Sequence, residues 1–142
     1  MDARDFAYRL ISAAVPFKEH GRGWDGLDCW GLVWLGYREV LGIDLPSYAE
    51  EYDTTRGRLE DGSPNRKLSD LIVGKRDLSW VRVYDLQPMN VALFRYASAP
   101  LHVGLVIDAR DMVHVERGAE VAVEPHAGPA WGPRLLGYWR PA

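Results

Sequence analysis

The pattern of apolar and polar positions changes once along the chain, from helical spacing near the start to alternation near the end. Over residues 2–15, apolar residues recur at helical spacing until Pro16 interrupts the pattern. A second apolar pattern of helical period covers residues 28–41, and Gly42 follows it as a C-terminal cap. The N-terminal third therefore predicts two helices.

From residue 90 onward the apolar residues alternate with polar ones, which predicts β-structure. Strands are expected over residues 90–96, 102–108, 112–116 and 120–125, with a last edge strand over 135–141. Between helices and strands, the polar residues 49–66 predict a long surface loop and residues 67–73 a short helix. Helices followed by an antiparallel meander indicate an α+β fold, with the N-terminal helices packed on a central antiparallel sheet. Residues 1–142 contain no internal repeat or linker and are expected to form one domain.

Composition and charge exclude several functions. The chain has 142 residues, of which 47% are hydrophobic and 26% charged, as in ordinary globular proteins. Its net charge is −3, and Lys and Arg are only scattered over residues 56–76, so no nucleic-acid partner is expected. The N-terminal segment lacks the pattern of a signal peptide, and the uncharged stretches are too short to span a bilayer. We therefore expect synthesis in the cytoplasm without membrane insertion.

The single cysteine, Cys29, lies in the segment GLDCWGLVWLGY, in the first turn of the second predicted helix. Free backbone N–H groups and the helix dipole favour negative charge there, so the thiol is expected to ionise easily. Asp28 is expected to cap this helix. A lone cysteine is more often a small buried packing residue than a nucleophile, so the assignment depends on its partners.

Two histidines occupy matching positions on neighbouring predicted strands. In LHVGLVID the odd-numbered residues are aliphatic, whereas His102 and Gly104 share the other face. In MVHVE, His114 likewise points away from an aliphatic face. Gly104 would leave room for the helix that carries Cys29 to approach this face. The pattern predicts a Cys–His–His arrangement, which is typical of nucleophilic catalysis.

The remaining candidate residues have simpler expected roles. The sequence contains no HExxH or CxxC segment, so neither a metal site nor a cofactor is expected. His20 and His126 lie in stretches rich in Gly or Pro, and both are expected to be solvated. An alternative role for His20 is to line the substrate cleft. Trp24 precedes the cysteine in a Gly-rich loop and is expected to form a wall of the substrate cleft.

Together, GLDCWGLVWLGY, LHVGLVID and MVHVE resemble the signature segments of the NlpC-type cell-wall peptidases, a family of papain-like cysteine peptidases. The resemblance covers about residues 5–140, apart from the loop at 49–80. It implies a papain-like fold in which Cys29 is the nucleophile, His102 the general base and His114 the residue that orients His102. The implied substrate is the stem peptide of peptidoglycan, cleaved through an acyl-enzyme that water hydrolyses.

Two positions depart from the family pattern. Many members carry a tyrosine near the reacting centre, twelve residues before the cysteine, where this chain has Phe17. The family's Gly-Asp before the strand of the base is Met89-Asn90 here, a change that we expect to be structural. One alternative function is therefore a structural protein that keeps the peptidase fold without its chemistry. Another is a different papain-like reaction, such as amide hydrolysis or acyl transfer on another substrate.

The form GxDCWGLV after a Gly-Arg loop also resembles the tail-associated cell-wall peptidases of phages and of phage-like gene transfer particles. This resemblance implies a location in the tail of a virion or phage-like particle. Tail or baseplate proteins are then the expected partners. Such a tail would carry the enzyme to the cell wall without a secretion signal.

Overall fold

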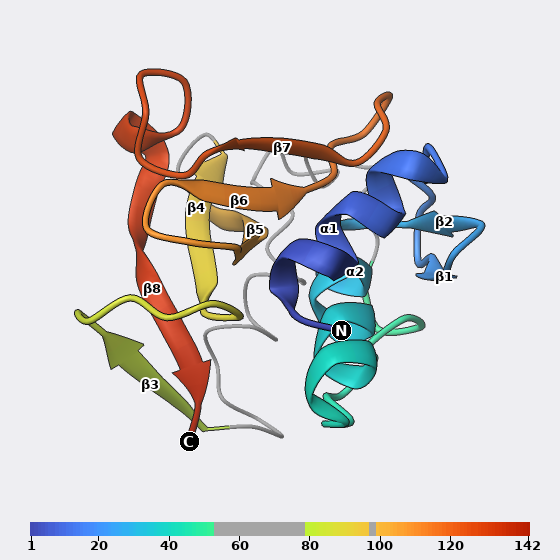
Figure 1. Cartoon of the computed structure of the whole chain (residues 1–142), viewed down its shortest axis with the longest axis horizontal. Helices are drawn as coiled ribbons and strands as arrows, with labels where there is room; N and C mark the ends of the chain where they lie inside the picture. Colours follow the sequence, from blue (N-terminus) through green and yellow to red (C-terminus); the bar gives the residue numbers. More distant parts are fainter. Residues whose placement is uncertain (53–78, 97–98) are drawn as a thin grey trace, which may run out of the picture.

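The computed structural model describes residues 1–52, 79–96 and 99–142 and has helices packed on one face of an antiparallel sheet (Figure 1). The helical elements are α1 (Ala3–Ser12), α2 (Cys29–Gly36), the π-helical turn η1 (Tyr37–Leu41) and the 3-10 turn η2 (Gly132–Arg134). The strands are β1 (Arg22–Gly23), β2 (Gly26–Leu27), β3 (Trp80–Val83), β4 (Val91–Tyr96), β5 (Ala99–Val106), β6 (Asp111–His114), β7 (Ala122–Pro125) and β8 (Leu135–Pro141). The predicted α+β class is confirmed.

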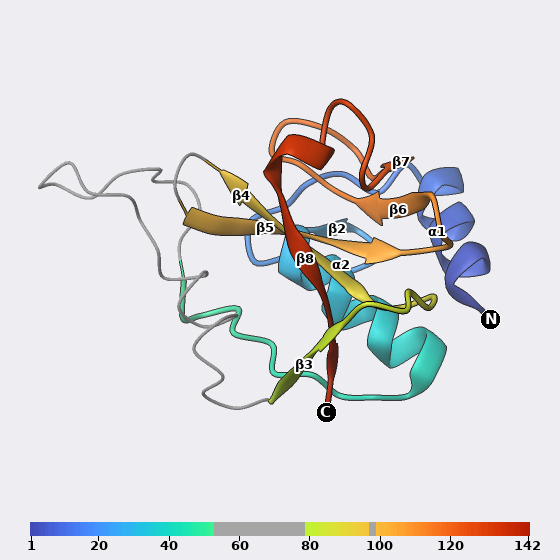
Figure 2. The same cartoon turned by 90° about the vertical axis from the view of Figure 1, so that its left-hand side faces the viewer.

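The large sheet has six strands in the order β3-β8-β4-β5-β6-β7, and every neighbouring pair is antiparallel. The predicted meander holds for β4 to β7, which are neighbours in chain order. The prediction of an edge strand over 135–141 is wrong, because β8 lies between β3 and β4 (Figure 1). Seen from the side, β8 crosses in front of β4 (Figure 2). The sequence analysis missed β3, a strand of only four residues whose two middle positions are exposed. It also missed the hairpin of β1 and β2, whose strands have two residues each.

The helix starts agree with the sequence, whereas the ends differ. The Asp2 and Asp5 side chains form a reciprocal capping box that begins α1, and this helix ends at Ser12, before Pro16. Asp28 caps α2 as predicted, since its side chain accepts the Gly31 N–H at 2.7 Å.

The second predicted helix is α-helical only as far as Gly36 and continues as the π-helical turn η1. The first residue of this turn, Tyr37, donates its hydroxyl to the carbonyl of Met89 at 2.5 Å. Gly42 ends the turn at φ 65°, a conformation that glycine adopts without strain. The predicted C-terminal cap is therefore confirmed.

The helix α2 packs on the aliphatic face of β5, opposite to the face predicted for it. A Cβ built on Gly36 would lie 2.7 Å from Leu105 Cδ2, so this glycine lets helix and strand approach closely. A Cβ on Gly104 would instead meet Met112 Sδ at 2.6 Å, within the sheet layer that faces away from α2. The expectation that Gly104 accommodates the helix is therefore wrong, because the side chain of Met112 fills that space.

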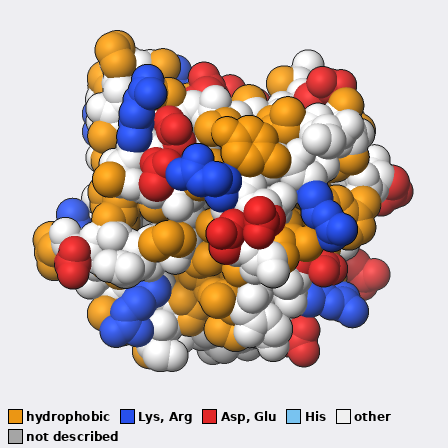
Figure 3. Space-filling view, in the orientation of Figure 1, with side chains coloured by type: hydrophobic (Ala, Val, Ile, Leu, Met, Phe, Trp, Pro, Cys, Tyr) orange, Lys and Arg blue, Asp and Glu red, His pale blue; other side chains and the backbone are white. Residues whose placement is uncertain are grey.

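Some predictions lie outside the described residues, namely the short helix over 67–73 and most of the loop over 49–66. Among the helices in the described ranges, none is long and apolar enough to cross a membrane. On the face drawn in Figure 3, acidic and basic side chains of the described residues are interspersed between apolar ones. This mixed surface agrees with the small net charge of −3.

Candidate active site

Cys29 is the first residue of α2 and lies against β5. The ladder between β5 and β6 has only two residue pairs and stops at Leu105. Beyond that point, the backbone N–H of Val103 donates a hydrogen bond to the Cys29 sulfur. Val103 directly follows His102, so the thiol and the predicted base meet the same short segment of β5. Because the ladder with β6 ends at Leu105, the edge of β5 at Val103 is open to α2. The helix packs on the aliphatic face of β5, yet its first residue reaches the segment whose histidine points to the opposite face.

The Cys29 thiol is buried, with 6% of the residue exposed. This burial, with a smaller contribution from the Asp28 carboxylate, raises the pKa of Cys29 to about 12. The backbone N–H groups of Val103 and Trp30, together with Arg22, act in the opposite direction and are outweighed. The expectation that the helix N-terminus makes this thiol ionise easily is therefore wrong for the free protein, which holds a neutral thiol.

His102 and His114 lie together as predicted. Their ring nitrogens, Nε2 of His102 and Nδ1 of His114, are hydrogen-bonded at 2.9 Å, and each residue is 1% exposed. Burial lowers the pKa of His102 well below its ordinary value, and His114 and Arg134 lower it further. Burial also lowers the pKa of His114, although Glu124 and Glu116 partly oppose it. Both imidazoles are therefore neutral near pH 7.

Trp131 holds the two imidazoles from one side. Its ring stacks on His102 with centroids 4.9 Å apart and an interplanar angle of 20°. The same ring meets His114 at 4.9 Å in an edge-on arrangement. Its indole N–H donates to Glu124 Oε2 at 3.2 Å. Sequence reasoning gave Trp131 no role, because it comes from the segment between β7 and η2 and no spacing relates it to the histidines.

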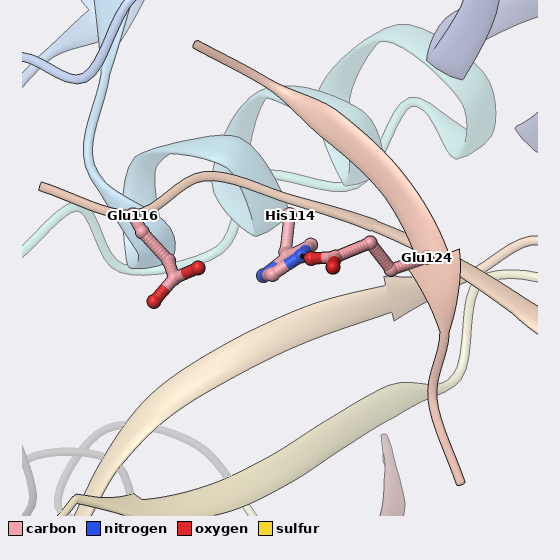
Figure 4. Close-up of side chains that lie close together, drawn as sticks. All are labelled: His114, Glu116 and Glu124. Carbon is pink, nitrogen blue, oxygen red and sulfur yellow. Dashed lines mark hydrogen bonds and ion pairs between the residues drawn. The ribbon is translucent and has the colours of Figure 1, made fainter. Parts of the chain in front are cut away.

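Two carboxylates complete this group (Figure 4). Glu124 of β7 is hydrogen-bonded to Nε2 of His114, and Glu116 lies on the other side of the same ring. The ligand atoms of His114, Glu116 and Glu124 all lie within 4.8 Å of one another, a grouping of the kind that a divalent cation accepts. The sequence gave no sign of it, because pairing of β6 with β7 brings Glu124 to His114 from ten residues away.

On the opposite side of Cys29, Asp28 is the centre of a buried polar network. Arg22 binds its Oδ1 at 2.8 Å, and the Tyr52 hydroxyl and the His20 backbone N–H donate to its Oδ2. Asp28 is 1% exposed, so these partners replace its water. The sequence analysis missed Arg22 and Tyr52; Tyr52 is buried even though it belongs to the predicted surface loop. The only signal in the sequence was an aspartate expected to cap a helix, six residues after an arginine.

The remaining predicted residues are placed as follows. Phe17 pairs through its backbone with Leu27 and packs under the Arg117 guanidinium at 5.0 Å. Trp24 packs edge-on against Phe6 of α1 at 5.8 Å and is 38% exposed. The contacts of Trp24 are thus with the first helix, and its role as a cleft wall stays a prediction.

The substitution at Met89-Asn90 is structural in this fold. Met89 adopts φ 76°, the left-handed conformation that suits the glycine of the family pattern. Asn90 Oδ1 accepts the Gln87 N–H at 2.7 Å, which an aspartate oxygen would do equally well.

The expectation that His126 is solvated is wrong. His126 is 3% exposed, and its ring nitrogens contact the Asp108 carbonyl at 3.2 Å and the Tyr138 hydroxyl at 2.7 Å. His20 is half-buried, and its ring is hydrogen-bonded to the Tyr52 carbonyl. Neither residue contacts the His102–His114 pair through a described interaction.

The shifted pKa values predict that stability has a maximum between about pH 7 and pH 9. The lowered pKa values of His102 and His114 mean that the unfolded chain binds more protons below pH 6.5, so stability falls as the pH decreases. The raised pKa of Cys29 means that stability falls as the pH rises from 9 toward 12. Each group contributes at most about 1.4 kcal/mol per pH unit. Urea unfolding at pH 5, 7 and 10 measures the free energy of unfolding at each pH, and His114→Gln is expected to reduce its fall between pH 7 and pH 5.

Replacing Gly31 by alanine is expected to lower the free energy of unfolding by about 3 kcal/mol, because the backbone has to move. A Cβ on Gly31 would lie 2.0 Å from the Gly21 carbonyl oxygen and 2.7 Å from an Arg22 nitrogen. Gly42→Ala is the control, since its Cβ meets nothing within 4 Å and only the positive φ is unfavourable, at about 1 kcal/mol. Equal urea midpoints for the two variants would contradict this packing.

The fold and the site define a class of protein: a papain-like α+β domain with a cysteine at a helix N-terminus beside a histidine pair on the sheet. The family model of the NlpC/P60 family matches residues 14–140. The chain belongs to the NlpC/P60 family, whose members are typically cysteine peptidases that hydrolyse peptidoglycan and include non-catalytic proteins.

Solved structures share this fold at low sequence identity. The NlpC/p60 domain of the peptidoglycan hydrolase SagA is 15% identical, with a TM-score of 0.56 and coverage of 87% of this chain and 86% of that one. An NlpC/P60 family protein from Bacillus cereus is 21% identical, with a TM-score of 0.65 and coverage of 99% and 40%. RipD from Mycobacterium tuberculosis, described as a non-catalytic NlpC/p60 domain protein, is 16% identical with a TM-score of 0.53 and coverage of 98% and 96%. No curated protein matches the chain.

Proposed function

We propose that this protein is a cysteine endopeptidase that hydrolyses the peptide stems of bacterial peptidoglycan. The observation that carries the proposal is the convergence of Cys29 and His102 on one segment of β5, with His114 bonded to His102 at 2.9 Å. Family membership supports the substrate class.

In the proposed reaction, the free enzyme starts from a neutral thiol and a neutral imidazole. Because the pKa of Cys29 is about 12, a preformed thiolate is scarce at neutral pH. The thiol proton therefore passes to His102 as the sulfur attacks the scissile carbonyl, which is general-base assistance. The protonated His102 then protonates the leaving amine, and a water activated by His102 hydrolyses the thioester. In the proposed reaction, the backbone N–H of Cys29 at the start of α2 supplies part of the oxyanion hole.

The test is digestion of purified muropeptides by the wild-type protein, with the products identified by mass spectrometry. We expect fragments with new amino termini within the stem peptide, and their absence with His102→Gln. An intact stem peptide after prolonged incubation with wild-type protein would reject the proposal. Cleavage of other amides but not of stem peptides would indicate a different papain-like reaction.

We further propose that a phage-like tail delivers the enzyme to the cell wall. The segment GLDCWGLV after the Gly21–Arg22 pair supports this, through its resemblance to tail-associated peptidases. Mass spectrometry of particles purified from the source organism tests the proposal. We expect the chain in the tail fraction, in association with tail or baseplate proteins; its absence from the particles would reject the proposal.

A second candidate function is a structural or peptidoglycan-binding protein that has lost the chemistry. Phe17, which lacks the hydroxyl of the family tyrosine, and the non-catalytic relative RipD favour it. This candidate predicts that the wild-type protein sediments with insoluble peptidoglycan without releasing fragments. It also predicts that particles carrying Cys29→Ala infect normally, whereas an infection defect would reject it.

A further inference from the structure

Two residues outside the predicted triad, Glu124 and Trp131, contact the histidine pair. Glu124 belongs to β7, and Trp131 belongs to the segment before η2. Glu124 binds His114, and Trp131 binds Glu124 and stacks on His102. Neither residue belongs to the segments that define the family resemblance. Glu124 contacts His114 and therefore acts on His102 through that residue, whereas Trp131 also contacts His102 directly.

We propose that Glu124 is a positioning residue that selects the ring tautomer of His114 and, through it, the tautomer of His102. This inference rests on the proposed function, because it concerns the base of the same reaction. It assigns the proton acceptor of the reaction to one ring nitrogen, Nδ1 of His102.

The argument begins at the carboxylate, which only accepts hydrogen bonds when ionised. The Trp131 indole N–H donates to Glu124 Oε2, the same oxygen that contacts Nε2 of His114. With the carboxylate as acceptor, His114 Nε2 has to carry the proton of this bond. Since a neutral imidazole has one N–H, Nδ1 of His114 is then an acceptor.

The same reasoning passes to the next ring. Nδ1 of His114 is 2.9 Å from Nε2 of His102, so His102 donates through Nε2–H. In a neutral His102 the lone pair is then on Nδ1. In the thiol transfer the S–H bond of Cys29 breaks and an N–H bond forms at Nδ1, which leaves an imidazolium that keeps its Nε2–H bond to His114. A carboxylate at the far end stabilises this positive charge, as the aspartate does in serine peptidases.

Burial makes the wrong tautomer of either histidine energetically costly. Both histidines are 1% exposed, so water is not available to satisfy a nitrogen left in the wrong state. Trp131 holds the plane of His102 at 20°, which restricts ring rotation as an alternative. The side chain of Glu124 is 38% exposed, so a substitution there changes the hydrogen bond with little repacking.

The test reads the tautomers directly, by two-bond ¹H–¹⁵N correlation spectra of protein labelled at its four histidines. We expect Nε2–H for both His102 and His114 in the wild type at pH 7.5. In Glu124→Lys, an ammonium that only donates takes the place of the carboxylate, so both rings are expected to switch to Nδ1–H. With Nδ1 of His102 blocked, alkylation of Cys29 by iodoacetamide at pH 7.5 is expected to slow by at least about tenfold.

Glu116→Lys is the matched control, because it changes the net charge by the same amount as Glu124→Lys. Glu116 acts on the pKa of His114 through its charge. The Glu116→Lys variant is expected to keep Nε2–H in both rings. If Glu124→Lys does not fold, Glu124→Met removes the acceptor and is expected to give mixed tautomers. Wild-type Nδ1–H in His102, or Nε2–H retained in both rings of the Glu124 variants, would overturn the proposal. These spectra need no substrate, so they separate failure of the relay from failure of the peptidase function.

Discussion

Cys29→Ala is expected to abolish cleavage of stem peptides, with a loss of at least about 10³-fold in kcat/KM while the fold is retained. The sulfur is the atom that forms the acyl-enzyme, and no other thiol exists in the chain. The thiol is packed at the start of α2, where alanine keeps the Cβ and leaves the cap at Asp28 unchanged. Release of new amino termini from muropeptides, followed by mass spectrometry, measures the loss.

The control for this variant is Ala13→Ser, at the exposed position that follows α1, which is expected to keep full activity. Thermal unfolding confirms that Cys29→Ala is folded before its rate is compared. Cleavage by Cys29→Ala at the wild-type rate would mean that another group carries the chemistry. If the wild-type protein and Cys29→Ala were both inactive toward stem peptides, the result would favour the non-catalytic candidate function.

Asp28→Ala is expected to lower the free energy of unfolding by about 3–5 kcal/mol, the range for removing one partner of a buried ion pair. The carboxylate accepts from Gly31 N–H, from Arg22 and from Tyr52, so its loss leaves donors without an acceptor. The side chain of Arg22 is 12% exposed and would become an uncompensated charge. Urea unfolding followed by tryptophan fluorescence measures the change.

Asp25→Ala is the control for Asp28→Ala. Asp25 pairs with Lys18 at 3.1 Å on the surface, and both side chains are more than half exposed. Its loss is expected to leave the free energy of unfolding nearly unchanged, as for other exposed ion pairs. If Asp28→Ala is no more destabilised than Asp25→Ala, the buried network does not hold the start of α2.

The sequence predicted those features of the fold and site that depend on local patterns. Alternation placed His102 and His114 on one face because side chains alternate strictly along strands, and Asp28 was recognisable as a cap. Both expectations agree with the structure. The position of β8 was not predictable in this way, because a strand's place in the sheet depends on pairing across the whole chain. The missed edge strand, β3, is too short to show a period.

The environment of Cys29 was missed for a related reason. A helix N-terminus predicts an easily ionised thiol when it is open to water, but burial beneath the sheet reverses the sign. Burial depends on what packs above the residue, which no local pattern contains. Glu124 and Trp131 were likewise missed because they reach the histidines from a strand and a turn with no spacing rule. Gly104 was assigned to the wrong neighbour, since a glycine shows that space is needed without showing what fills it.

The central claim is that Cys29 and His102 act together as nucleophile and base. The most direct test is the rate of Cys29 alkylation by iodoacetamide between pH 6 and pH 10, compared for wild type and His102→Gln. The rate of His102→Gln is expected to rise steadily through pH 9 without levelling off, because only the scarce thiolate reacts when the pKa of Cys29 is about 12. The wild-type rate is expected to change little between pH 7.5 and pH 9, because neutral His102 takes the proton from the neutral thiol over this whole range. At pH 7.5 it is expected to exceed the rate of His102→Gln by about 10²-fold, the lower end for general-base assistance. Superimposable profiles for the two proteins would contradict the claim and leave Cys29 as a packing residue.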